Sequence, residues 1–162
     1  MVDPKKVTPP PELAYDLIGA MFFGYRDFVG VADAALATTG YGRAHHRVLY
    51  FVDRRPGLTV GELLKILKIS KQGVARVLKT LVDDGLITMT PGARDRREKN
   101  LATTPAGHAL VVRLATLQSA RIEAAVAAAN PADRAAIKRF LTALVDPSET
   151  ADVAAIIGAP TP

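Results

Sequence analysis

The stretch from Leu58 to Thr104 constrains the fold of this chain more than any other, because two short amphipathic helical segments are followed directly by a charged hairpin. Thr59 and Glu62 have the spacing of a capping box, in which each side chain hydrogen-bonds the backbone N–H of the other residue. Apolar residues then recur at helical period, and Lys68-Ile69 predicts a short turn. Ser70 is suited to cap a second helix by accepting from its first N–H groups.

The second helical segment has two chemically different faces. Four apolar residues at i, i+3, i+4 and i+7 share the inner face: Val74, Val77, Leu78 and Leu81. The outer face carries three basic side chains and an amide: Lys71, Gln72, Arg76 and Lys79. Gly85 follows the segment and predicts its end, since glycine is favoured just past a helix C-terminus.

The period of the sequence changes after Gly85. Residues 86–90 read as a strand, Pro91-Gly92 as a turn signal and residues 100–103 as a returning strand, with a charged tip over residues 93–99. Thr104-Pro105 then predicts the cap and the first position of a new helix. We therefore predict a helix-turn-helix with a β-hairpin behind it.

The positive charge of the chain is concentrated in this region. The whole chain has a net charge of +5, but residues 43–99 contain 13 Lys and Arg against 6 Asp and Glu, a net charge of +7 that leaves −2 elsewhere. A local charge cluster is usually a solvated face, whereas a basic lobe between neutral or acidic flanks is typical of phosphate-binding surfaces. Because charge, helix pair and hairpin coincide, we expect double-stranded DNA as a partner.

These residues resemble the MarR family of bacterial winged-helix repressors. The resemblance is carried by GLTVGELLKILKISKQGVARVLKTLVDDGLI, by Asp95-Arg96-Arg97 and by Thr104-x-Ala106-Gly107, and it is close over residues 43–107. It implies a homodimer whose second helix of the pair enters the major groove and whose hairpin, the wing, enters the minor groove. It also implies a pocket for a small-molecule effector between the DNA-binding lobe and the dimer helices.

The segments on either side of the lobe predict long helices. We expect a proline-rich arm up to Pro11, a helix from Glu12 to about Thr38, a helix at 43–54, a long helix at 104–129 and shorter ones at 130–145 and 149–157. The fold class is then mainly α with a small β-hairpin wing, a winged helix-turn-helix between long N- and C-terminal dimerisation helices. We divide it into residues 1–42 (arm and dimerisation helix), 43–104 (DNA-binding lobe) and 105–162 (C-terminal dimerisation helices), one compact domain overall.

Composition excludes several classes of protein. The 162 residues contain no cysteine, so disulfides, cysteine-ligated zinc and thiol redox chemistry are absent. Lys5-Lys6 precedes proline-rich sequence rather than an apolar run, and no uninterrupted apolar stretch reaches about 18 residues. We expect a cytoplasmic protein that does not enter the membrane.

The candidate DNA contacts fall into three groups. Gln72 and Arg76 are the expected base readers, because an amide can pair with adenine and a guanidinium with guanine in the major groove. Thr59, Ser70, Lys71 and Lys79 are the expected phosphate contacts of the helix pair. The wing supplies the remaining candidates, Arg94, Arg96, Arg97 and Lys99, of which a tip arginine would enter the minor groove. Asp95 and Arg97 are expected to pair and hold the tip in shape.

The aromatic residues and histidines near the first two helices are candidates for the effector pocket: Tyr15, Tyr25, Phe28, Tyr41, His45 and His46. Such residues are more often core than pocket. Adjacent histidines cannot face the same side of a helix, so they form a poor metal pair, and we expect no metal and no cofactor.

Catalysis has little support in this sequence. There is no cysteine nucleophile, no Gly-x-Ser-x-Gly elbow and no phosphate-binding glycine loop. We therefore expect no enzyme but a sequence-specific DNA-binding transcriptional regulator, by resemblance a ligand-responsive repressor that binds a palindromic operator as a homodimer. Two alternatives stay open: a winged helix that docks another protein, and an architectural DNA binder without sequence preference.

Overall fold

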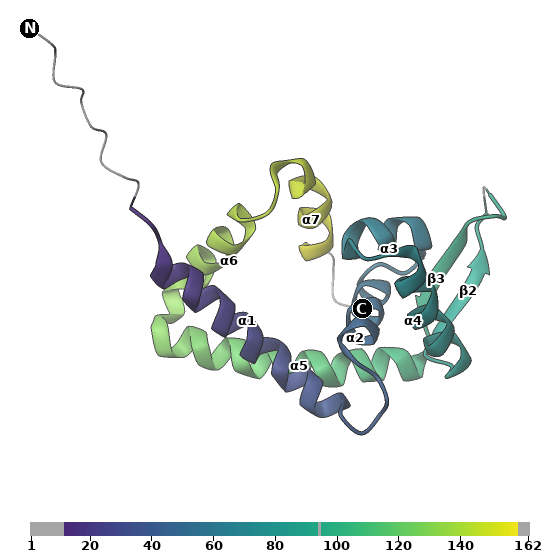
Figure 1. Cartoon of the computed structure of the whole chain (residues 1–162), viewed down its shortest axis with the longest axis horizontal. Helices are drawn as coiled ribbons and strands as arrows, with labels where there is room; N and C mark the ends of the chain where they lie inside the picture. Colours follow the sequence, from purple (N-terminus) through teal and green to yellow (C-terminus); the bar gives the residue numbers. More distant parts are fainter. Residues whose placement is uncertain (1–11, 94, 159–162) are drawn as a thin grey trace, which may run out of the picture.

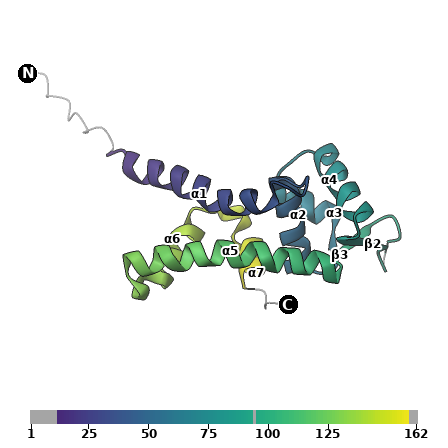
Figure 2. The same cartoon turned by 90° about the horizontal axis from the view of Figure 1, so that it is seen from below.

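Two long helices cross each other, and a compact lobe lies at one end of the molecule (Figure 1). The structure, a computed structural model, describes residues 12–93 and 95–158. The long helices, α1 (Tyr15–Leu36) and α5 (Pro105–Ala129), pack against each other. Figure 2 shows them extending away from the lobe, with the N-terminal half of α1 at the far end.

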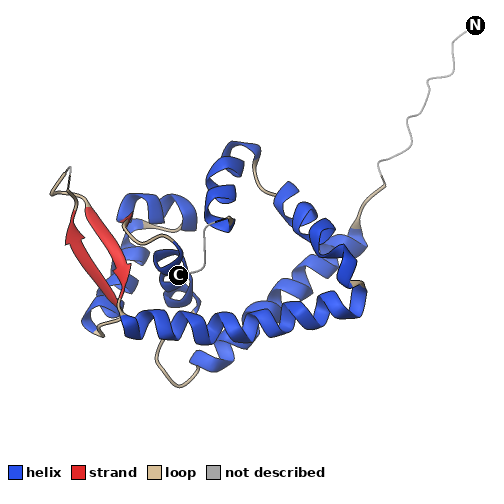
Figure 3. Ribbon diagram, turned by 180° about the vertical axis from the view of Figure 1, so that it is seen from behind, coloured by secondary structure: helices blue, strands red, loops and turns tan. Residues whose placement is uncertain are grey.

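The lobe contains the helix pair and a small sheet. Its elements are α2 (Arg43–Arg54), β1 (Leu58–Thr59), α3 (Val60–Leu67), α4 (Lys71–Asp83), β2 (Ile87–Pro91) and β3 (Lys99–Thr103). The strands form an antiparallel sheet in the order β1-β3-β2, and β2 and β3 project from the lobe as a two-stranded ribbon (Figure 3). This arrangement confirms the predicted winged helix-turn-helix.

The C-terminal part beyond α5 is built from short helices. In order these are the 3₁₀ turn η1 (Pro131–Asp133), α6 (Arg134–Ala143), the 3₁₀ turn η2 (Pro147–Glu149) and α7 (Thr150–Ile157). The chain turns back after α6, so α7 lies between α6 and the lobe (Figure 1). Among the described helices, none is long and apolar enough to cross a membrane.

The predicted helix boundaries are close to the observed ones. The helix predicted at 43–54 is confirmed, whereas α1 begins three residues after Glu12 and ends two before Thr38. The segment predicted as one helix over 130–145 opens as a 3₁₀ turn because Asn130 caps Pro131–Asp133 before α6 begins. The predicted arm up to Pro11 lies outside the described residues.

One strand was not predicted from the sequence. Leu58 and Thr59 pair with Leu101 and Asn100, which adds β1 to the predicted hairpin. A segment of two residues is too short to show alternation of apolar and polar side chains, and its pairing partner lies about forty residues away. Strand β1 fixes the start of α3 against the wing.

The core of the lobe uses the predicted apolar faces. Val74, Val77, Leu78 and Leu81 of α4 are all buried. They pack in one cluster with residues from α2, α3, α5 and the sheet: Val48, Leu49, Val52, Leu58, Leu63, Ile87, Leu101 and Val111. The inner face of α4 is therefore fixed by the core, and its opposite face is presented to solvent.

The start of α5 is held tightly against the end of α4. Thr104 caps α5 by accepting from the Gly107 N–H at 3.1 Å, and its hydroxyl donates to the Gly85 carbonyl at 2.7 Å. A Cβ atom at Gly107 would lie 2.1 Å from the Leu86 carbonyl oxygen. Only glycine permits this close approach, which joins the long helix rigidly to the lobe.

Candidate nucleic-acid interface

Helix α4 presents the predicted polar face to solvent. Lys71, Gln72, Arg76 and Lys79 are all exposed. Ser70 caps the helix by accepting from the Gly73 N–H at 3.1 Å, as predicted. A Cβ atom at Gly73 would lie 3.1 Å from the Ser70 hydroxyl oxygen, so glycine leaves room for the cap. The helix thus begins with an exposed Ser70 hydroxyl and open backbone, features suited to phosphate contact.

The cations on this face differ in their partners. Lys79 Nζ is 2.5 Å from Asp83 Oδ2, and this hydrogen bond raises the pKa of Lys79. Within the described part of the chain, Lys71, Gln72 and Arg76 have no side-chain hydrogen bond or ion pair. Their side chains can bind DNA without first breaking a protein contact, whereas Lys79 must exchange Asp83 for a phosphate.

Thr59 is fully engaged in the capping box. Its hydroxyl donates to Glu62 Oε2 at 2.9 Å and accepts from the Glu62 N–H at 3.2 Å, while its own N–H donates to Glu62 Oε2 at 2.8 Å. Arg55 Nη2 also contacts Glu62, at 3.2 Å. The predicted capping box is confirmed, and the predicted phosphate contact of Thr59 would have to share a hydroxyl that already has two partners.

The tip of the wing is a tight turn built around Asp95. Asp95 Oδ1 accepts from the backbone N–H of Arg97 at 2.8 Å, so the bond recorded between these residues involves the Arg97 backbone rather than its guanidinium. A Cβ atom at Gly92 would lie 2.7 Å from the Asp95 carbonyl oxygen, which explains the glycine there. Arg96, Arg97 and Lys99 are exposed on the wing, and Arg94 lies outside the described residues.

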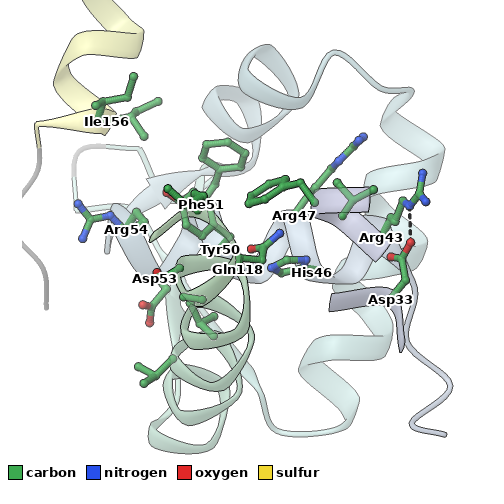
Figure 4. A pocket seen from close by; sticks show the side chains of 18 of the residues that line it. Asp33, Arg43, His46, Arg47, Tyr50, Phe51, Asp53, Arg54, Gln118 and Ile156 are labelled. Carbon is green, nitrogen blue, oxygen red and sulfur yellow. Dashed lines mark hydrogen bonds and ion pairs between the residues drawn. The ribbon is translucent and has the colours of Figure 1, made fainter. Parts of the chain in front are cut away.

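A cavity of about 670 Å³ lies beside the lobe, between α1, α2, α5 and α7 (Figure 4). Its apolar lining combines aliphatic residues with four aromatic side chains: Tyr25, Phe28, Tyr50 and Phe51. Three arginines of α2 line it: Arg43, Arg47 and Arg54. Arg43 Nε is 2.7 Å from Asp33 Oδ2, and Arg47 Nη2 donates to the Tyr25 hydroxyl at 2.5 Å.

Three of the six predicted pocket residues line this cavity: Tyr25, Phe28 and His46. Burial lowers the pKa of His46, so its neutral form is favoured there. The other three residues lie elsewhere. Tyr15 is 72% exposed, His45 Nδ1 accepts from the Gly42 N–H at the start of α2, and the Tyr41 hydroxyl donates to Asp84 Oδ2 at 2.8 Å.

Most of the polar residues that line the cavity were not predicted from the sequence. Asp53 and His108 line it, and Asp53 is 4% exposed. A signal for Asp53 was present, because it stands four residues after Leu49 and so belongs to the apolar inner face of α2. A charged residue on a core face is unusual and requires hydrogen-bond partners.

A winged helix-turn-helix with a basic, solvent-exposed second helix defines a class of protein, the DNA-binding regulators of transcription. A sequence model of the MarR family matches residues 39–98. The HTH-type transcriptional regulator PetP of Rhodobacter capsulatus is 45% identical over 131 residues, which cover 81% of this chain and 79% of that protein. This chain therefore belongs to the MarR family, whose members are non-enzymatic DNA-binding regulators.

Solved structures share the fold. The transcriptional regulator SlyA superposes with a TM-score of 0.67 at 16% identity, covering 80% of this chain and 91% of that one. The transcriptional repressor CouR, solved bound to a 23-mer DNA duplex, superposes with a TM-score of 0.65 at 25% identity, covering 82% and 92% of the two chains.

Proposed function

We propose that this protein is a homodimeric repressor that reads a palindromic operator and is released from it by a small-molecule effector. The observation that carries the proposal is the pairing of two surfaces on one chain. One is the exposed basic face of α4, and the other is a large exposed apolar face on the terminal helices. We assign DNA recognition to residues 43–104 and dimerisation to residues 1–42 and 105–162.

The dimer is supported by apolar side chains that a monomer would leave in water. Those of the first helix and the residues before it are Leu13, Tyr15, Leu17, Ile18, Met21, Phe22, Phe23 and Tyr25. Those of the α6 region are Phe140, Leu141 and Leu144. Both groups lie at the end of the molecule away from the lobe (Figures 1 and 2). Exposed apolar side chains in this number would be covered by a second copy, and two-fold symmetry is the commonest arrangement.

The DNA sequence would be recognised by the two copies of α4 that this two-fold symmetry positions on the duplex. Gln72 and Arg76 would contact base edges in the major groove, with Ser70, Lys71 and Lys79 on flanking phosphates. Arg96, Arg97 and Lys99 would place the wing along the minor groove. A two-fold axis separates equivalent helices by about one turn of DNA, roughly 34–36 Å, so the operator should be palindromic. The CouR repressor, solved bound to a 23-mer DNA duplex, supports DNA binding by this fold.

The effector would bind in the cavity beside the lobe. Its aromatic lining favours a flat apolar molecule. Arg47 has a neutral phenol as its recorded partner, so a ligand with a negative group would gain an ion pair there. The spacing between the two lobes of the dimer would decide whether both fit the operator. A ligand that binds better to a dimer with the wrong spacing would shift the population toward that state.

Selection of genomic fragments by the purified protein at physiological salt tests the proposal. We expect a palindrome with half-sites about one helical turn apart. Equal retention of all fragments with a steep salt dependence would identify an architectural DNA binder instead. Retention of no DNA would favour the protein-docking alternative.

A further inference from the structure

Asp53 is the one buried charged side chain in residues 12–93 and 95–158. It stands in the last turn of α2, a helix that contacts both β3 and α5. A buried carboxylate persists only where hydrogen-bond donors replace the water it has lost. The partners of Asp53 therefore show which parts of the fold depend on it.

Both recorded partners of Asp53 use the same oxygen. Thr103 Oγ1 donates to Asp53 Oδ1 at 2.8 Å. His108 Nδ1 lies 2.9 Å from that oxygen, and since a carboxylate oxygen accepts, the imidazole is the donor. One atom thus joins three elements: α2, the end of the wing strand β3 and the first turn of α5.

The two donors belong to different functional regions. Thr103 is the last residue of β3 and pairs with Ile87, the first residue of β2, so it stands at the root of the wing. His108 lines the cavity, as does Asp53 itself, and its side chain is 41% exposed. A molecule in the cavity therefore has direct access to one of the two donors that hold the carboxylate.

We propose that Asp53 is a positioning residue that sets the angle of the wing on DNA and ties that angle to the wall of the cavity through His108. This inference rests on the function proposed above. The Thr103 hydroxyl ties the root of the wing to Asp53, and His108 donates to the same oxygen and so helps to orient the carboxylate. Drawing His108 toward a ligand releases one side of this link and lets the wing root shift.

A single substitution can remove each donor. Thr103→Val keeps the size and strand preference of the side chain but deletes the hydroxyl, and His108→Ala keeps a good helix former in α5. Asp53→Ala is a poorer probe because it leaves both donors unpaired and opens a void under α2. Thr88→Val is the matched control, since the Thr88 hydroxyl donates to the Ala102 carbonyl within the same wing at 3.3 Å without reaching Asp53.

Hydroxyl-radical footprinting on the selected operator, combined with guanine methylation protection, separates wing contacts from those of α4. We expect Thr103→Val and His108→Ala to lose the minor-groove protection at the operator flanks while keeping the major-groove protection of each half-site. The Kd of each variant should rise about tenfold, the weight of one or two lost minor-groove contacts. The Thr88→Val variant should give the wild-type pattern.

The double variant gives an independent readout. Because both donors act through one oxygen, the Kd of Thr103→Val/His108→Ala should exceed that of either single variant by much less than the product of the two effects. Uniform weakening of all protections, or full additivity, would reduce Asp53 to a structural residue and overturn the inference while leaving the proposed function intact. A protein that selects no operator would overturn both.

Discussion

The cationic side chains of α4 have different surroundings, so we expect their removal to weaken DNA binding in different ways. Arg76 stands in the middle of the exposed face without a protein partner among the described residues, whereas Lys71 stands beside the Ser70 cap at the helix start. A guanidinium over base edges discriminates between sequences, while an ammonium near the helix N-terminus meets phosphate on any sequence. Substitution of Arg76 should therefore reduce sequence-specific binding, and substitution of Lys71 should reduce binding to any sequence.

We expect Arg76→Ala to weaken operator binding by about 1–3 kcal/mol while non-specific binding changes little. Lys71→Ala should weaken both kinds of binding and reduce the slope of log K against log salt by about one. Competition titrations over a range of salt concentrations measure both quantities. Equal losses for specific and non-specific DNA in Arg76→Ala would assign this residue to phosphate.

Glu62 carries the pH dependence of the α3 cap. The Thr59 N–H holds the pKa of this carboxyl below its ordinary value, with help from the Thr59 hydroxyl and Arg55. A carboxyl whose pKa is lower in the folded state stabilises at pH values above its unfolded pKa, and the stabilisation is lost as the pH falls through the folded pKa.

We therefore expect Glu62→Gln to lower the free energy of unfolding at pH 7 and to have no such effect well below about pH 4. Because the Glu62 side chain is 43% exposed, the loss should stay below about 1 kcal/mol. Urea unfolding at the two pH values measures it. If the loss of unfolding free energy were the same at both pH values, it would come from the packing of the side chain rather than from its charge.

At the scale of elements, the junction between α4, β2 and α5 depends on one close approach. Gly107→Ala would force a Cβ to within 2.1 Å of the Leu86 carbonyl oxygen, so we expect it to cost more than about 2 kcal/mol of stability. Gly61→Ala is the matched control, because its Cβ would meet nothing closer than 3.9 Å and alanine is the better helix former. Denaturant unfolding compares the two, and similar stabilities would contradict the packing described for α5.

The helix pair and its caps could be predicted because they depend on residues a few positions apart. Thr59, Ser70 and Thr104 each cap the helix that their local sequence indicated. Strand β1 and the contacts of Asp53 could not be predicted in the same way. Thr103 and His108 lie 50 and 55 residues from Asp53 in the sequence, and no local pattern predicts that they contact it.

The lining of the cavity could be predicted only in part for the same physical reason, and its use as an effector pocket stays a prediction. Aromatic residues near the first two helices were the right kind of lining, but the side of the helix that faces the cavity depends on how α1 and α5 cross. Tyr25 and Phe28 fall on that side, whereas Tyr41 turns to Asp84 instead. Ile156 of α7 lines the cavity only because the chain turns back after α6.

At the scale of the whole molecule, the exposed apolar face of α1 should decide the oligomeric state. Phe22 is 64% exposed in the single chain, and Phe22→Glu would place a charge in the proposed interface. We expect this variant to be a folded monomer in sedimentation equilibrium. Met89→Glu, on the wing and outside that face, should sediment as the wild type does. A Phe22→Glu variant that stays dimeric would place the interface elsewhere.

The central claim, that two copies of this chain read one palindrome, is tested most directly by the stoichiometry of the complex. Native mass spectrometry of the full-length protein on its selected duplex should give a mass of two chains and one duplex. Scrambling one half-site should weaken that complex sharply without producing a stable complex of one chain. A single chain bound to the intact duplex would contradict the account. So would a complex whose affinity stays the same when one half-site is scrambled.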